Sequence, residues 1–378
     1  MTRPLYFLHI PKTAGSSIQY YLEQRFAIDE VCPAQLQPEI VRMPQQSLRR
    51  YRLFAGHFWG LERILGLPTD VLVFLREPVA RLISNYRHIL QCPDHRLHHW
   101  AKSCSIEEFA RHPHLRNRQT RQLAAHHRHY RPDMAEDECL ALAREVVKRA
   151  AFLGIFERME KSLALLAKTF SWPPAMLPKI NVTTCPFGLP SHGREVFAEE
   201  NQLDMALYAW ALRWFDRHWA DVTLREARQA YERRLLERLQ TPPLVFEMGE
   251  AICGTGWYAP ERWGNEIFRW SGPDRTATVD LPIPPPAARA VRFQVLHITP
   301  PGWSGAPEVR LWEKRLPVCK ESESAHATIY TAPVEASNPA RKYMRLHFVV
   351  DETFCPAEIG ASTDTRRLGI ALSWIEVR

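Results

Sequence analysis

The chain has 378 residues, 46% of them hydrophobic and 24% charged, which is the profile of a globular protein long enough for two domains. Its net charge of +7 suits an anionic ligand. The sequence has no basic tract with interleaved aromatic residues, and this excludes nucleic acid as the favoured partner.

The first predicted element is a buried strand over residues 5–10, an apolar run with aromatic and branched side chains. A proline ends the run, and a helix follows whose apolar side chains Ile18, Leu22 and Phe26 share one face. Unpaired backbone N–H groups and the positive end of the helix dipole converge at such a strand-to-helix junction. The junction therefore predicts an anion site.

The loop of this junction carries small residues and one cation. Gly15 permits a tight backbone, Ser16 or Ser17 can cap the helix, and Lys12 adds a positive charge at the mouth. The order of residues is not that of a Walker A loop. Composition alone leaves two interpretations open, a phosphate loop or an ordinary turn with a surface lysine. The candidate loop residues are Lys12, Thr13, Ala14, Gly15, Ser16 and Ser17.

The next part of the chain alternates strands with helices, which predicts a mostly parallel sheet covered on both faces. Residues 27–50 are rich in proline, glutamine and arginine, and we expect an irregular excursion there. Residues 91–133 are expected to form helices and loops that cover a cleft. The predicted strands are 52–57, 70–75 and 151–156, and the predicted helices begin near 78 and cover 136–149, 159–170 and 203–214.

Beyond about residue 241 the helical periodicity vanishes, and short alternating runs predict an all-β sandwich or jelly roll. The predicted domains are therefore residues 1–240 and 241–378. Four tryptophans of the second domain could stack on sugars, but we favour burial in the core, because aromatic side chains bury large apolar areas. These are Trp257, Trp263, Trp270 and Trp303. The predicted strands include 277–281, 290–295, 343–349 and 368–377.

Two candidate sites follow the ends of predicted strands. Arg76 leaves the strand over 70–75 and Ser84 lies on the next helix, so both can face one anion, and arginine matches phosphate oxygens in a bidentate way. Taken singly, they could be a surface arginine and a solvated hydroxyl group. His57 ends the predicted strand over 52–57, and the unperturbed pKa of a histidine, about 6.5, would allow proton transfer near neutral pH. A purely structural histidine is the alternative.

These segments together resemble one family. The run His9-Ile-Pro-Lys-Thr-Ala-Gly-Ser-Ser17 resembles the 5′-phosphosulfate loop of the sulfotransferases that use 3′-phosphoadenosine 5′-phosphosulfate (PAPS), in the heparan sulfate 2-O and 6-O branch. The stretch from Leu75 to Ser84 is similar to the 3′-phosphate motif of that branch. Gly56-His57-Phe58-Trp59 resembles the segment that holds its catalytic histidine. The resemblance covers nearly all of residues 1–240.

The resemblance implies an α/β, P-loop-like sulfotransferase domain that moves a sulfuryl group from PAPS to a hydroxyl of a glycan or glycolipid by in-line displacement. The product nucleotide would be 3′-phosphoadenosine 5′-phosphate (PAP), and no metal would take part. His57 would remove the acceptor proton, and Lys12 would neutralise charge on the bridging phosphate oxygen. The implied nucleotide contacts are residues 12–17 with Arg76, Ser84, Asn181 and Thr183, and the implied acceptor contacts are His88, Asn117, Gln119 and Arg121.

Two other functions are alternatives to this one. A nucleotide kinase of similar topology would show a Walker A lysine–serine pair and magnesium-binding carboxylates, and the sequence shows neither. A glycan-binding protein on a degenerate sulfotransferase scaffold is disfavoured by the intact Lys12, His57, Arg76 and Ser84. A zinc site would need closed Cys/His spacing, which is not found. The residues considered for it are Cys92, His95, His98, His99 and Cys104.

The last expectations concern location. No apolar run approaches the roughly 20 residues that cross a bilayer, so no transmembrane segment is predicted. No leader pattern precedes the first strand, and we therefore expect a cytoplasmic protein. The eight cysteines form no C-x-x-C pair, which predicts free, reduced thiols.

Overall fold

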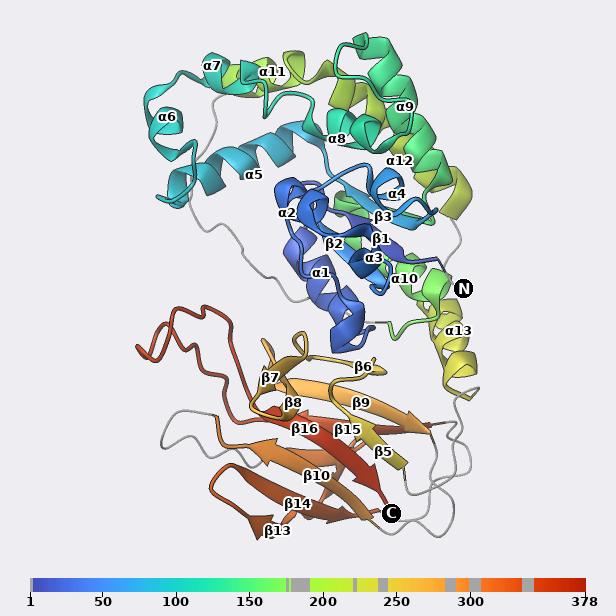
Figure 1. The fold of residues 1–378 in the computed structure, drawn as a ribbon, viewed down its shortest axis with the longest axis vertical. Coiled ribbons are helices and arrows are strands. Elements are labelled where there is room, and N and C mark those ends of the chain that lie inside the picture. The colour runs from blue at the N-terminus through green and yellow to red at the C-terminus, as the bar shows by residue number, and fades with distance from the viewer. Residues whose placement is uncertain are drawn as a thin grey trace. The chain divides into compact units, whose positions relative to one another are not determined.

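A computed structural model describes residues 3–174, 177, 191–219, 223–236, 244–282, 290–298, 307–334 and 343–378. It divides into two compact units (Figure 1). The first unit comprises residues 1–19, 32–166 and 179–223, and the second comprises 20–31, 167–178 and 224–378. The predicted domain boundary between residues 240 and 241 lies outside the described residues and stays a prediction.

The first unit is built on a four-stranded parallel sheet with the strand order β2-β1-β3-β4. Every strand residue except Asp70 is buried, as expected for a parallel sheet covered on both faces. Leu8 pairs with Gly56 and Leu75 with Ile155, so the carboxyl ends of all four strands meet at one edge. The strands are β1 (Leu5–Leu8), β2 (Leu53–Gly56), β3 (Asp70–Leu75) and β4 (Phe152–Ile155).

Helices surround this sheet in the first unit (Figure 1). They are α2 (Gln37–Arg42), α3 (Gln45–Leu48), α4 (Leu61–Leu65), α5 (Pro78–Gln91), α6 (His98–Ser103), α7 (Ile106–Arg111), α8 (Arg118–His126), α9 (Glu136–Arg149), α11 (Ser191–Glu199) and α12 (Gln202–Trp219), with the 3-10 helix η2 (Phe156–Arg158). Helices α1 (Gly15–Glu23) and α10 (Met159–Phe170) begin in the first unit and end in the second.

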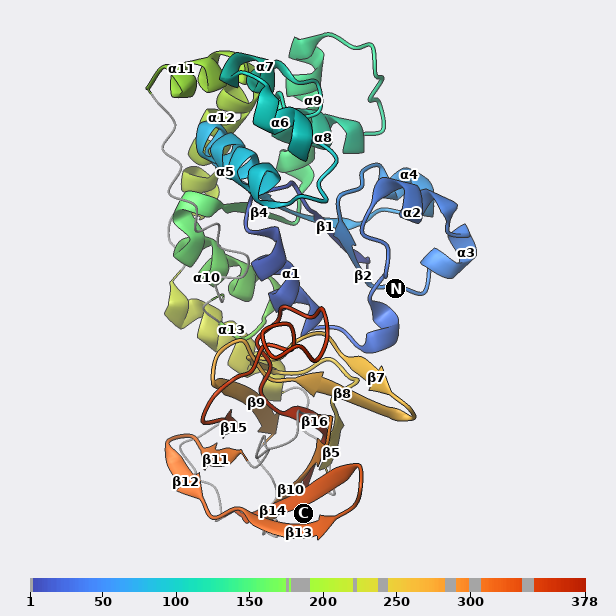
Figure 2. The same cartoon turned by 90° about the vertical axis from the view of Figure 1, so that its left-hand side faces the viewer.

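Helix α5 shows how the sequence sets one of these elements. Pro78 occupies its first turn, and the Glu77 side chain accepts hydrogen bonds from the N–H groups of Val79 and Ala80. Its apolar face shares a buried cluster with α6, α7 and α11, which lie beside it in Figures 1 and 2. This packing fixes the helix that carries Ser84 and His88.

The prediction of an irregular excursion over residues 27–50 was wrong in part. The segment contains the 3-10 helix η1 (Ile28–Glu30) and the two short helices α2 and α3. Glu39 supplies the reason for α2, because its carboxylate accepts from the N–H groups of Gln35 and Leu36 just before the helix. Prolines at the starts of α2 and α3 interrupt the apolar periodicity from which a helix is predicted.

The second unit contains helix α13 (Leu224–Leu236) and two antiparallel sheets. One sheet has the order β13-β14-β10-β16-β8-β7, with β5 also paired to β16, and the other has the order β12-β11-β15-β9-β6. Both sheets contribute to one hydrophobic core, and Figure 2 shows them on opposite sides of it. The strands are β5 (Leu244–Glu247), β6 (Gly254–Thr255), β7 (Glu261–Trp263), β8 (Glu266–Trp270), β9 (Thr276–Pro282), β10 (Ala290–Leu296), β11 (Glu308–Leu311), β12 (Lys314–Leu316), β13 (Cys319–Glu323), β14 (Ala327–Pro333), β15 (Tyr343–Val349) and β16 (Ala371–Val377).

The tryptophans of this unit divide between core and surface. Trp257 and Trp270 are buried, as the burial prediction requires. The burial prediction is wrong for Trp263, which lies on β7 in the β7–β8 hairpin and is 38% exposed. Trp303 lies outside the described residues.

A buried arginine joins the end of α1 to the strands of the second unit. Arg269 is fully buried, and its five N–H groups donate to five backbone carbonyls, those of Glu23, Phe26, Met248, Glu250 and Tyr258. The last carbonyls of a helix lack partners within the helix, and a cation there is favoured by the helix dipole. Burial lowers the pKa of Arg269 to about 9, so the guanidinium stays protonated at neutral pH.

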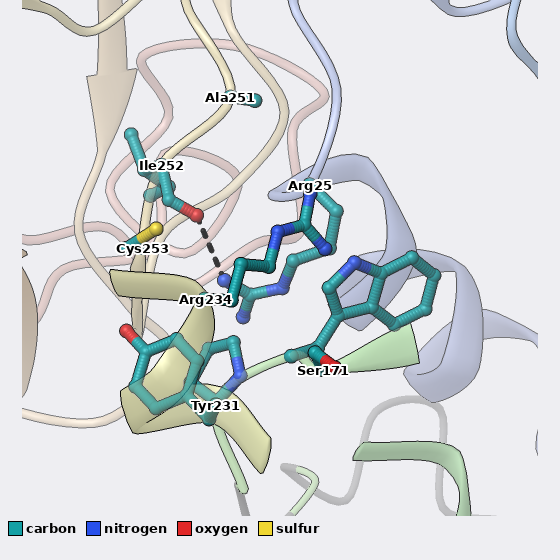
Figure 3. A pocket seen from close by; sticks show the side chains of 9 residues that line it. Arg25, Ser171, Tyr231, Arg234, Ala251, Ile252 and Cys253 are labelled. Atoms are coloured by element: carbon teal, nitrogen blue, oxygen red, sulfur yellow. Dashed lines mark hydrogen bonds between the residues drawn. The ribbon is translucent and has the colours of Figure 1, made fainter. Parts of the chain in front are cut away.

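Arg25, just beyond the end of α1, makes a second such connection. Its guanidinium donates to the carbonyls of Ile252 and Gly254, as Figure 3 shows for Ile252. The side chains around it, which include Tyr231, leave a cavity of about 10 Å³. This is room for about one water molecule and not for a nucleotide. The cavity therefore belongs to the packing of the second unit.

Candidate active site

The four parallel strands deliver the candidate site residues to one edge of the sheet. His9 follows β1, His57 follows β2, Arg76 follows β3 and Phe156 follows β4. Ligands of open parallel sheets bind in the crevice outside the carboxyl ends of the strands. The structure thus brings together three segments that the sequence predicted separately.

The anion loop, residues 12–17, has an unusual backbone. Lys12 and Ala14 are non-glycine residues with left-handed φ angles of 70° and 69°. Such conformations cost energy and are concentrated at functional sites, and turns of this kind aim successive N–H groups inward. The Thr13 hydroxyl donates to the carbonyl of Ile10 at 2.8 Å and is fully buried, so Thr13 can offer an anion only its backbone.

Gly15 is needed for a reason that its position in a turn did not reveal. Its φ angle is not left-handed. A Cβ atom at this position would lie 1.4 Å from Nε2 of His9, so the buried His9 ring occupies the space of the missing side chain. Any other residue at position 15 would displace that ring.

His57 is held in one tautomer by the backbone of His9. Its Nδ1 lies 2.9 Å from the His9 carbonyl oxygen, which can only accept, so Nδ1 carries the proton and Nε2 keeps its lone pair. The side-chain amide of Gln122 donates to the same carbonyl at 3.0 Å. Burial lowers the pKa of His57, the bond to His9 offsets part of this, and the charge of Arg118 lowers it further. His57 is therefore neutral at pH 7 and can accept a proton.

Arg76 lies against the anion loop. Its Nη1 donates to the Lys12 carbonyl at 3.1 Å, and its guanidinium carbon sits 4.1 Å from the centre of the Phe156 ring. Its Nε is buried and has no hydrogen-bond partner among the described residues. Burial and the charge of Arg76 lower the pKa of Lys12, so two cations are held close together. A site of this kind favours an anion.

One face of α5 lies toward the same loop. Burial and the Lys12 charge lower the pKa of His88, which places His88 near Lys12, and the Cys92 sulfur lies 3.4 Å from Nδ1 of His88. Ser84, His88 and Cys92 are spaced by four residues and so share one helix face. Ser84 therefore lies on the face of α5 that is turned to the anion loop.

The segment predicted to contact the acceptor is largely buried. Asn117 has a left-handed φ angle of 50° and is 1% exposed, and its groups bond to Asn201 and Asp204. Gln119 is also 1% exposed, and its amide bonds to the backbone of Arg76. Arg121 donates to the Pro113 carbonyl, away from the anion loop. Their contact with an acceptor stays a prediction.

Comparison with known proteins identifies the family to which the chain belongs. The model of the sulfotransferase family matches residues 2–226, which is more than half of the chain. The chain belongs to the sulfotransferase family. The prediction of a family 2 sulfotransferase is thus confirmed, whereas the heparan sulfate branch stays a prediction. A search of curated proteins found no match.

The candidate site also contains residues that were not predicted from the sequence. The charge of Arg118 lowers the pKa of His57. Gln122 donates a hydrogen bond to the His9 carbonyl, and the ring of Phe156 packs against the Arg76 guanidinium. Phe156 was predicted as the last residue of the strand over 151–156, whereas β4 ends at Ile155 and Phe156 follows it just as Arg76 follows β3. Arg118 lies between the predicted acceptor contacts Asn117 and Gln119, but nothing in the sequence singles it out.

Within the described ranges, no cluster of three or more His, Cys, Asp or Glu side chains is arranged to hold a metal ion. None of the helices in the described part of the chain is both long and apolar enough to span a bilayer. Asn181 and Thr183, predicted to contact the nucleotide, lie outside the described residues.

Proposed function

We propose that this sulfotransferase transfers the sulfuryl group of PAPS to a hydroxyl group of a glycan or glycoconjugate, with His57 as the general base. The observation that carries the proposal is the bond from His57 Nδ1 to the His9 carbonyl at 2.9 Å. It leaves a neutral Nε2 as a proton acceptor at the carboxyl edge of the sheet, next to the anion loop.

The chemistry of the loop and of Arg76 fits the two anionic ends of PAPS. When bound, PAPS supplies a sulfuryl group already activated by a phosphate leaving group. Backbone N–H groups of residues 12–17 and the Lys12 ammonium would hold the 5′-phosphosulfate. Arg76, whose buried Nε has no partner among the described residues, and Ser84 on α5 would hold the 3′-phosphate. Asn181 and Thr183 are kept as further nucleotide contacts on the resemblance alone.

Each residue would then have a defined task in the transfer. Nε2 of His57 would accept the proton of the acceptor hydroxyl. The Lys12 ammonium would neutralise the negative charge left on PAP when the sulfuryl group is transferred to the acceptor oxygen. The loop N–H groups are fixed before the reaction, so most of the rate enhancement comes from positioning and preorganised charge.

The glycan acceptor rests on the resemblance and on the position of His88 beside Lys12. His88 is the predicted acceptor contact whose pKa is lowered by the Lys12 charge. Asn117 and Gln119 are too buried to offer their side chains as they stand. The acceptor site is therefore assigned to the space between His57 and His88.

The test of the proposal is nucleotide selectivity followed by an acceptor screen. PAP at a hundred times its dissociation constant should stabilise the protein by about 2.7 kcal/mol. ATP lacks a 3′-phosphate and should give a clearly smaller rise in Tm. Equal stabilisation by both nucleotides would contradict the proposed 3′-phosphate site. A mass-spectrometric screen of glycans and glycolipids for added sulfate, in the presence of PAPS, then tests the acceptor class.

A further inference from the structure

The Gln119 side chain forms an amide-to-backbone pair with Arg76. Its Nε2 donates to the Arg76 carbonyl at 2.9 Å, and its Oε1 accepts from the Arg76 N–H at 3.0 Å. Gln119 is 1% exposed, so these bonds are shielded from water. One side chain thus holds both backbone polar groups of a residue 43 positions away in the chain.

Arg76 needs such a partner because it stands just beyond the sheet. The last pair of β3 with β1 is Leu72 with Phe7 and the last with β4 is Leu75 with Ile155, so no strand in the described residues pairs with residue 76. Buried backbone N–H and C=O groups must be satisfied elsewhere. The Gln119 amide bonds to both the N–H and the carbonyl of Arg76, as the backbone of a neighbouring strand would.

Gln119 is itself held from the other side. Its N–H donates to Asp204 Oδ2 at 3.1 Å, and Thr120 donates to Asp204 Oδ1 from both its N–H and its hydroxyl, each at 2.8 Å. Asp204 on α12 is fully buried, with the Arg81 guanidinium 4.0 Å away. The amide is therefore fixed to a rigid part of the first unit.

We propose that Gln119 is a positioning residue that fixes Arg76 for the 3′-phosphate of the nucleotide and thereby sets the preference for 3′-phosphorylated nucleotides. This inference rests on the proposed function, because it assumes that Arg76 binds that phosphate. It gives Gln119 a task other than acceptor contact: both ends of its amide are turned to Arg76. The bidentate match of a guanidinium to phosphate needs such fixed geometry.

The test compares two nucleotides on the full chain. Gln119→Met keeps the length of the side chain and removes both bonds to Arg76. Dissociation constants for PAP and for adenosine 5′-phosphate, which lacks the 3′-phosphate, are measured by titration calorimetry. We expect the constant for PAP to rise about 10- to 100-fold, the range for loss of a charge-assisted hydrogen bond. The constant for adenosine 5′-phosphate should change less than about twofold.

Gln122→Met is the matched control. Gln122 lies on the same helix, is 3% exposed, and donates to the His9 carbonyl instead of Arg76. Its variant should keep the wild-type ratio of the two constants. The ratio is the dissociation constant for adenosine 5′-phosphate divided by that for PAP. An equal ratio in wild type and Gln119→Met would overturn the inference. An equal fall of this ratio in both variants would overturn it as well. A wild type without preference for PAP would instead overturn the proposed function.

A double-mutant cycle separates positioning from general damage. If Gln119 acts through Arg76, Gln119→Met should have no further effect on PAP affinity in an Arg76→Met background. Effects that multiply would show a route that bypasses Arg76 and would overturn the inference. Gln119→Asn, which is too short to reach both Arg76 groups, gives the same comparison if the methionine variant does not fold.

Discussion

Replacing His57 by alanine tests the base most directly. The substitution removes Nε2, which the bond from Nδ1 to the His9 carbonyl leaves as a proton acceptor, but it removes no proposed nucleotide contact. A general base contributes about 10²–10⁴ in rate, or about 3–5 kcal/mol of barrier at 1.36 kcal/mol per tenfold. We expect turnover to fall by this factor while the affinity for PAP stays within about twofold.

The pH profile gives a second measure of the same group. Burial lowers the pKa of His57 below its ordinary value of 6.5. A base works in its neutral form, so wild-type kcat/KM should be flat from pH 7 upward and fall as the pH drops below about 6.5. The small residual rate of His57→Ala should lose this fall.

The assay is sulfate transfer from PAPS to the acceptor found by the mass-spectrometric screen, with PAP affinity measured in parallel. His88→Ala is the control, because His88 also lies near Lys12 and its pKa is also lowered. Near-normal turnover in His57→Ala together with a large loss in His88→Ala would refute the reasoning and move the base to His88. Loss of PAP affinity in His57→Ala would show that His57 supports the loop instead.

Three other substitutions test the surroundings of the site and the packing of each unit. Gly15→Ala should destabilise the protein by about 1–3 kcal/mol in urea unfolding and lower turnover, because its Cβ would displace the His9 ring that packs 4.1 Å from His57; unchanged turnover would contradict this contact. Arg269→Met should cost about 3 kcal/mol or more, because five buried carbonyls lose their donor; a loss below 1 kcal/mol in calorimetry would refute the role. Burial lowers the pKa of His126 to about 4 in the folded protein. As the pH falls below 6.5, this histidine therefore takes up a proton in the unfolded state before it does so in the folded state. The free energy of unfolding should drop by about 2 kcal/mol between pH 7 and pH 5 on this account, and His126→Phe should remove that part of the drop.

The strands and the candidate site of the first unit could be predicted because their signals are local. Continuous apolar runs mark β1 and β3, and the chemically active residues come directly after the strand ends. The predicted strand over 70–75 and helix over 136–149 agree with β3 and α9 to the residue. A parallel sheet then brings His57 and Arg76 to one edge without further information.

The contacts that tune the site could not be predicted in this way. Gly15 is explained by the His9 ring, and Gln119 by the backbone of Arg76, and neither partner can be inferred from residue type. Helices α11 and α13 were missed as well. In α13 four arginines, two glutamates and a glutamine fill seven of thirteen positions, so its apolar stripe is weak.

The end of α1 shows why domain limits are harder to predict than strands. Its apolar stripe predicts one helix, and the change of composition near residue 241 predicts a boundary far from it. Residues 20–31 nevertheless belong to the second compact unit, where Arg269 binds the Glu23 carbonyl 246 positions away in the chain. A chain cut near residue 241 would leave the last carbonyls of α1 and the Arg25 guanidinium without these partners. The end of α1 therefore depends on bonds from residues far along the chain, which its own sequence does not reveal.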